Sequence, residues 1–214
     1  MSNYVIVDLE MCSVPRGVKR EAFPCENELI QIGAVVVDES YRITDEFVTY
    51  VSPEYGVIDS FIENLTGISR ADVSGAPCAE EALKRFLQWL PQDAVLVSWS
   101  DSDRKQILRE MRGKGIALEP MDAYLKNWID CQKSFGERME ANKKYKLSEA
   151  LIIADVDYDS GEHDALVDAK NTARLFVKMQ TEPEMKLNPY YSGHVETAAY
   201  NPFAVLLGSF DLAG

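Results

Sequence analysis

The sequence predicts an α/β domain whose mixed five-stranded sheet is covered by helices on both faces. Three extended apolar segments follow one another in the first 51 residues, and helical and extended patterns alternate after residue 57. Consecutive strands joined by short turns pair antiparallel, whereas strands separated by helices pair parallel. We therefore expect a three-strand antiparallel meander followed by parallel strands. The 46% hydrophobic content is sufficient for its core.

The meander is predicted from β-branched runs and turn residues. The run Val5-Ile6-Val7 indicates a buried first strand, which ends in two acids. Turn residues at 38–41 separate the two strands that follow. The expected loop, second strand and third strand cover residues 11–27, 29–37 and 43–51.

Apolar residues at helical spacing alternate with short apolar runs in the rest of the chain. Gly67 is typical of the end of a helix and Pro77 of the start of the next one. The expected helices cover residues 58–65, 77–90, 104–112, a segment from 132, 146–153 and 164–179. The expected strands cover residues 94–98 and, with a weaker pattern, 124–130.

Two carboxylates stand two residues apart at the end of the first strand. Side chains at i and i+2 of a strand point to the same face, so Asp8 and Glu10 are expected to project together. Like charges this close resist joint ionisation unless a cation lies between them. An isolated Asp-x-Glu is more often a pair of solvated acids. A site is therefore inferred only from the partners that follow.

Further acids, and one of two histidines, stand where the predicted elements could bring them to the same edge. Asp101 or Asp103 follows the next strand at the start of a helix, and Asp168 lies in the last helix. Five positions would place His163 and Asp168 about 140° apart on a regular helix. A shared site therefore requires His163 to come from the loop before the helix, which Gly161 permits.

With these residues, the chain resembles the DEDDh exonucleases of the ribonuclease H-like superfamily. The segment 7–10 (Val-Asp-Leu-Glu) matches the first motif, D-x-E, and the segment 163–169 (His-Asp-Ala-Leu-Val-Asp-Ala) matches the third, H-x-x-x-x-D. The segment 98–108 (Ser-Trp-Ser-Asp-Ser-Asp-Arg-Lys-Gln-Ile-Leu) is similar to the second motif in its Eri1-like form. The resemblance includes Glu-Leu-Ile-Gln-Ile-Gly-Ala at 28–34 and Leu-Thr-Gly-Ile at 65–68.

The second motif departs from the His-Asn-Ala-x-Phe-Asp form of proofreading exonucleases. Its spacing to Ile107 and Leu108 assigns Asp103 as the second-motif acid, with Asp101 as the alternative. In the tyrosine variant of the superfamily a tyrosine would stand at position 164. That position is Asp164, so the histidine variant fits.

The resemblance implies a site for two divalent ions, Mg²⁺ or Mn²⁺, which favour carboxylate oxygens. Asp8, Glu10 and Asp168 would hold the ion that carries the nucleophile. Asp8 and, through water, Asp103 would support the second ion. Two such ions stabilise charge on the attacking and the leaving oxygen. His163 would be the general base.

The resemblance also suggests substrate contacts and a domain boundary. Met11 would place an apolar side chain against the terminal base, although core filling is an equal alternative. Trp99 could stack on a base, although a buried position behind the strand end is more typical. The exonuclease domain is expected at residues 1–182. A tail at 183–214 is expected to pack on this domain or on a partner.

The net charge of −13 disfavours the wrapping of long duplexes, because phosphate binding normally leaves a basic footprint. The negative charge is compatible with a site that binds only a few nucleotides of single-stranded or 3′-overhanging nucleic acid. Three basic clusters are more typical of solvated faces than of binding sites. They comprise Arg16, Lys19 and Arg20; Arg104, Lys105, Arg109, Arg112 and Lys114; and Lys143, Lys144 and Lys146.

Four cysteines without a C-x-x-C pair, and no signal-like or membrane-spanning pattern, predict a reduced, cytoplasmic protein. The favoured function is a metal-dependent 3′→5′ exoribonuclease that releases nucleoside 5′-monophosphates. A 3′→5′ exodeoxyribonuclease of proofreading type and a catalytically inactive nucleic-acid-binding module are the alternatives. No motif acid is missing, which disfavours the inactive module.

Overall fold

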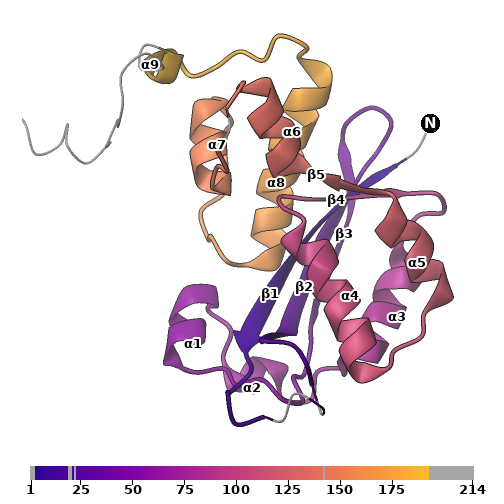
Figure 1. Cartoon of the computed structure of the whole chain (residues 1–214). Coiled ribbons are helices and arrows are strands. Elements are labelled where there is room, and N and C mark those ends of the chain that lie inside the picture. Colours follow the sequence, from indigo (N-terminus) through magenta and orange to yellow (C-terminus); the bar gives the residue numbers. More distant parts are fainter. Residues whose placement is uncertain (1–2, 19–20, 22, 142, 193–214) are drawn as a thin grey trace, which may run out of the picture.

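The chain folds around a five-stranded mixed sheet in the order β3-β2-β1-β4-β5 (Figure 1). The computed structural model describes residues 3–18, 21, 23–141 and 143–192. β1 pairs antiparallel with β2, and β2 with β3, whereas β1–β4 and β4–β5 are parallel. The predicted fold class is therefore confirmed. The strands are β1 (Tyr4–Ser13), β2 (Asn27–Val37), β3 (Ile43–Tyr50), β4 (Val95–Ser98) and β5 (Trp128–Asp130).

Helices cover both faces of the sheet because successive side chains of its central strands point to opposite faces, and both faces are apolar. Val5, Val7 and Leu9 of β1 join a core with α3, α4 and α5, whereas Ile6 joins a second core with α6, α7 and α8. The helices are α1 (Ser60–Thr66), α2 (Arg70–Val73), α3 (Ala79–Trp89), α4 (Ser102–Lys114), α5 (Glu119–Lys126), α6 (Cys131–Arg138), α7 (Leu147–Ile153), α8 (Ala165–Thr181) and α9 (Pro189–Ser192).

Two predicted strands have clearly different bounds in the structure, and one short helix was not predicted. The first strand does not end at the acids, since β1 pairs with β2 as far as Ser13. The segment 124–130 is a strand only from Trp128. Its first part belongs to α5, whose buried Met121 and Leu125 lie one turn apart against the core. The short helix α2 was missed, and its four residues are too few to give a periodic pattern.

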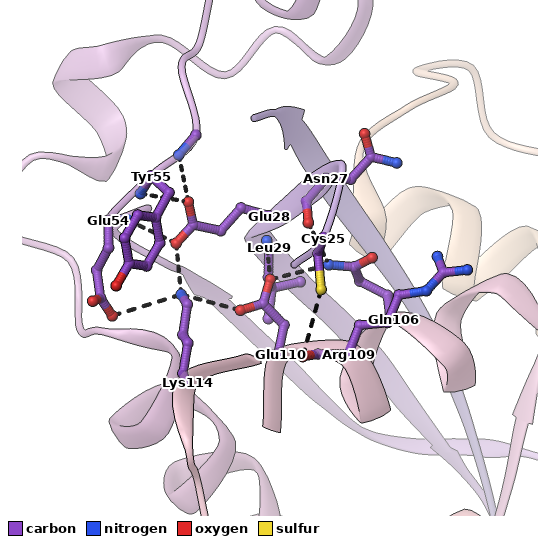
Figure 2. A network of polar contacts seen from close by, with 11 residues as sticks. Cys25, Asn27, Glu28, Leu29, Glu54, Tyr55, Gln106, Arg109, Glu110 and Lys114 are labelled. Atoms are coloured by element: carbon purple, nitrogen blue, oxygen red, sulfur yellow. Dashed lines mark hydrogen bonds and ion pairs between the residues drawn. The ribbon is translucent and has the colours of Figure 1, made fainter. Parts of the chain in front are cut away.

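A buried row of polar side chains fastens α4 to the start of β2 (Figure 2). Lys114 Nζ lies 2.6 Å from Glu28 Oε1 and 3.0 Å from Glu110 Oε2. The backbone N–H of Leu29 donates to Glu110 Oε1 at 2.7 Å, and Gln106 Nε2 donates to Asn27 O at 3.1 Å. Lys114 was expected on a solvated face, but its side chain is only 5% exposed because it neutralises two buried carboxylates.

The predicted tail is described only to residue 192. Asn188 N–H donates to Ile153 O at 2.9 Å, and Leu187 and Tyr191 pack on the core beside α8. Residues 193–214 of the tail lie outside the described part of the chain. None of the helices in the described part is both long and apolar enough to cross a membrane.

Candidate active site

A cleft of about 470 Å³ brings together the sequence motifs. Its lining comes from β1, the start of α4, α7 and the start of α8 with the loop before it. The predicted site residues that line it are Asp8, Glu10, Met11, Trp99, Asp103, His163 and Asp168. A larger hollow of about 610 Å³ beside α6 contains none of these residues.

Asp8 and Glu10 reach the cleft from the α8 side of the sheet. They alternate with Leu9, which packs on the opposite face against α4. Asp8 pairs with Gly33 of β2, and Gly33 allows α8 to start directly over this strand. A Cβ at Gly33 would lie 2.3 Å from the carbonyl carbon of Ala165. The glycine therefore sets how closely α8 approaches the two acids.

Asp103 enters the cleft from the first turn of α4. It is 5% exposed, and its Oδ1 accepts the backbone N–H of Leu9 at 3.2 Å. Asp101 instead forms ion pairs with Arg104 at 2.5 Å and Lys105 at 2.9 Å, and the Arg104 guanidinium lowers the pKa of its carboxyl. The geometry therefore favours Asp103 over Asp101 as the second-motif acid.

His163 precedes α8 rather than belonging to it, as its position relative to Asp168 requires. Its backbone is left-handed, with φ of +70°, and its N–H donates to Asp168 Oδ2 at 3.0 Å. Asp164 then caps the helix by accepting the N–H groups of Leu166 and Val167. Ligand atoms of Glu10, His163 and Asp168 lie within 4.8 Å of one another.

Burial raises the pKa of all four motif carboxyls. Together with repulsion from Asp168 and Asp103, it raises the pKa of Glu10 to about 8. The pKa of Asp103 rises to about 7, chiefly by burial. Burial and the neighbouring acids raise the pKa of Asp8 well above its usual range. The pKa of Asp168 is also raised by burial, although the N–H of His163 opposes this change.

The electrostatics of the cleft fit a divalent cation. Among its described lining residues, Lys146 is the single lysine or arginine, whereas five carboxylates line the cleft, those of the four motif acids and of Glu162. Hard oxygen ligands are the donors that Mg²⁺ and Mn²⁺ prefer. The cluster of Glu10, His163 and Asp168 offers three ligand atoms at coordination spacing. Bound cations would stabilise the charged carboxylates, whose pKa values are raised by burial and by repulsion between the acids.

Two residues predicted to bind substrate lie at the cleft in different ways. Met11 is half-buried in its wall. Trp99 is only 9% exposed and packs against Phe135, with ring centroids 6.2 Å apart. Substrate binding by either residue remains a prediction. Lys146 and Tyr158, which also line the cleft, were not predicted as site residues because neither belongs to a motif.

Comparison with known proteins identifies the family. The model of the family described as Exonuclease (RNase_T) matches residues 5–176. The chain belongs to this exonuclease family. Its resemblance to the DEDDh exonucleases is confirmed, since the family's DEDDh and ERI1-type members are among its matches. The exonuclease motifs predicted from the sequence thus lie on the elements that form the cleft.

The relatives of this exonuclease chain include enzymes named for RNA and for DNA. ERI1 exoribonuclease 2 of Danio rerio is 32% identical over 188 residues, with 76% of this chain and 33% of that protein covered. DNA polymerase III subunit epsilon of Aquifex aeolicus is 32% identical over 196 residues, with coverages of 88% and 87%. The chain spans about half or less of several curated relatives, such as 52% of 3'-5' exoribonuclease 1 of Mus musculus.

Solved structures agree with this assignment. The structure described as full-length 3'-exonuclease has a TM-score of 0.72 and 26% identity, and covers 87% of this exonuclease chain and 85% of its own. The nuclease domain of 3'hExo, described as a DEDDh family member bound to rAMP, has a TM-score of 0.68 and 25% identity, with coverages of 87% and 96%.

Proposed function

We propose that the chain is a metal-dependent 3′→5′ exoribonuclease that releases nucleoside 5′-monophosphates from single-stranded or overhanging RNA. The observation that carries the proposal is the meeting of Asp8, Glu10, Asp103 and Asp168 with His163 in one cleft. The ERI1-type relatives support RNA as the substrate. A cytoplasmic location is proposed from the cysteine pattern alone.

Each residue has a role in this mechanism. The four carboxylates would hold two Mg²⁺ or Mn²⁺ ions, which supply positive charge for the attacking and leaving oxygens when bound. His163 would remove a proton from the attacking water as that water displaces the 3′ oxygen of the preceding nucleotide. The side chain of His163 is exposed to the solvent that provides the water, and its backbone is fixed by Asp168.

The terminal nucleotide would lie against the wall of the cleft. The half-buried Met11 would contact its base, and the exposed edge of Trp99 could add a second apolar contact. Both residues line the cleft together with the motif acids, so a base held there would have its phosphodiester beside the carboxylates. This arrangement would position the last bond of the strand for cleavage.

A second candidate is a 3′→5′ exodeoxyribonuclease, which the epsilon-subunit relative supports because most of both chains align. The two candidate functions use the same site and differ in the sugar of the substrate, which is ribose in RNA and deoxyribose in DNA. The test compares kcat/KM on single-stranded RNA and DNA of one sequence with Mn²⁺. A higher value for RNA supports the proposal, whereas equal or faster cleavage of DNA would replace it with the second candidate. No cleavage of either would favour an inactive binding module.

A further inference from the structure

The outer face of α4 carries a row of basic side chains. Lys105, Arg109 and Arg112 are exposed and follow the spacing i, i+4, i+7, which places them on one side of the helix. The whole chain has a net charge of −13, so a basic surface of this kind stands out from the acidic remainder. This surface is therefore suited to attract a polyanion.

The two arginines of this row are not neutralised by the described part of the chain. Lys105 pairs with Asp101, and Lys84 and Arg85 of α3 pair with carboxylates one turn away. No ion pair joins Arg109 or Arg112 to any described carboxylate. In Figure 2 the Arg109 guanidinium points away from the buried Lys114 cluster. The arginine charges are thus available to a ligand.

A hollow of about 530 Å³ lies beside these arginines. It is lined by Arg109, Arg112 and the segment 24–27, which includes the acid Glu26. This segment is fixed to α4, because Cys25 Sγ donates to Arg109 O at 3.7 Å and Gln106 holds Asn27 O. The hollow therefore lies between α4 and a segment that hydrogen bonds hold against this helix.

The hollow lies on the same side of α4 as the catalytic cleft. Ser102 lines the cleft, and the seven residues from Ser102 to Arg109 turn the helix by about 700°, so the two side chains point the same way. They are separated by about 10 Å along the axis, and Arg112 lies one turn further. A strand that leaves the cleft along α4 would meet both arginines within a few nucleotides.

We propose that Arg109 and Arg112 bind backbone phosphates of the substrate strand, a few nucleotides upstream of the 3′ terminus held in the cleft. This inference rests on the proposed exonuclease function. The guanidinium group suits the role because its planar fork binds phosphate oxygens bidentately. The two positive charges of these arginines exceed the single negative charge of Glu26 in the hollow. They also explain how a chain with an acidic surface can hold nucleic acid.

The test compares a double variant with a control of equal charge change. Arg109→Ala with Arg112→Ala removes the two arginines of the row, whereas Lys84→Ala with Arg85→Ala removes two exposed cations from α3. Both are assayed on a 12-nucleotide RNA and on a dinucleotide. We expect kcat/KM on the longer RNA to fall roughly tenfold through KM in the first variant only. The dinucleotide should change little, since it cannot reach the row.

Salt dependence gives a second readout of the same contacts. Loss of two phosphate contacts should reduce the slope of log(kcat/KM) against log[salt] by about 1.4, at about 0.7 per contact on a single strand. Equal losses on the long RNA and the dinucleotide, or behaviour like that of the α3 control, would overturn the inference while leaving the exonuclease function intact. Failure of the unaltered protein to cleave either RNA would instead overturn the function on which the inference rests.

Discussion

The backbone N–H of Leu9 donates to Asp103 Oδ1 at 3.2 Å, which joins two motifs that are 94 residues apart. Leu9 lies between Asp8 and Glu10 on β1, so this one hydrogen bond sets the distance from the second-motif acid to both first-motif acids. The rest of α4 is fixed to β2 through Glu110 and Lys114. The acids of the cleft are thus held by the scaffold, which is the pre-organisation that catalysis requires.

Replacement of His163 should separate the role of a base from that of a metal ligand. We expect His163→Ala to lower kcat by roughly 10²- to 10⁴-fold, the usual contribution of a general base. Mn²⁺ affinity, measured by calorimetry, should change little in the same variant. A large loss of Mn²⁺ affinity would contradict the base assignment and make His163 a ligand, as its distance to Glu10 and Asp168 allows.

Gly33 should not tolerate a side chain. Gly33→Ala would place a Cβ 2.3 Å from the backbone of Ala165, so α8 would have to move away from β2. We expect a loss of at least about 2 kcal/mol in the free energy of unfolding. Gly17→Ala is the matched control, because a Cβ there meets no atom within 4 Å. Equal denaturation midpoints for the two variants would show that the close approach is not required.

Lys114 should be essential for stability although it lies outside the cleft. Lys114→Met leaves Glu28 and Glu110 buried with no cation between them, which should cost roughly 3–5 kcal/mol. The exposed pair of Lys133 and Glu137 supplies the control, since Lys133→Met should cost less than about 1 kcal/mol. Urea denaturation measures both values. A Lys114 variant as stable as the control would refute the structural role assigned to this network.

The metal-free protein should lose stability as the pH rises. The folded state raises the pKa of Glu10 to about 8 and that of Asp103 to about 7, above their usual values near 4. Between pH 4 and pH 8 the folded state therefore holds more protons than the unfolded state, and the free energy of unfolding falls with pH. In EDTA we expect a Tm several degrees lower at pH 8 than at pH 5.5, and Mn²⁺ should restore it.

Glu10→Gln provides the control for this pH dependence. The amide does not ionise, so the fall in Tm between pH 5.5 and pH 8 should be smaller in the variant. A metal-free Tm that is constant or rises over this range in the unaltered protein would show that folding does not raise the pKa values of Glu10 and Asp103.

Much of the fold and most of the cleft could be predicted from local patterns. The β-branched run of β1 and the D-x-E and H-x-x-x-x-D spacings each depend on neighbours in the sequence. The position of Lys114 could not be predicted. A lysine in a basic stretch is normally exposed, and its buried partner Glu28 is 86 residues away. Likewise α5 resembled a strand because its helical face is defined by the core against which Met121 and Leu125 pack.

The central claim is that the four carboxylates form a metal-dependent 3′→5′ exonuclease site. The most direct test incubates 5′-labelled single-stranded RNA with the unaltered protein and with Asp8→Asn, in Mn²⁺ and in EDTA. We predict a ladder that shortens from the 3′ end only for the unaltered protein with Mn²⁺, while circular dichroism shows that Asp8→Asn remains folded. An undiminished rate in the folded Asp8→Asn variant, or equal cleavage in EDTA, would contradict the claim.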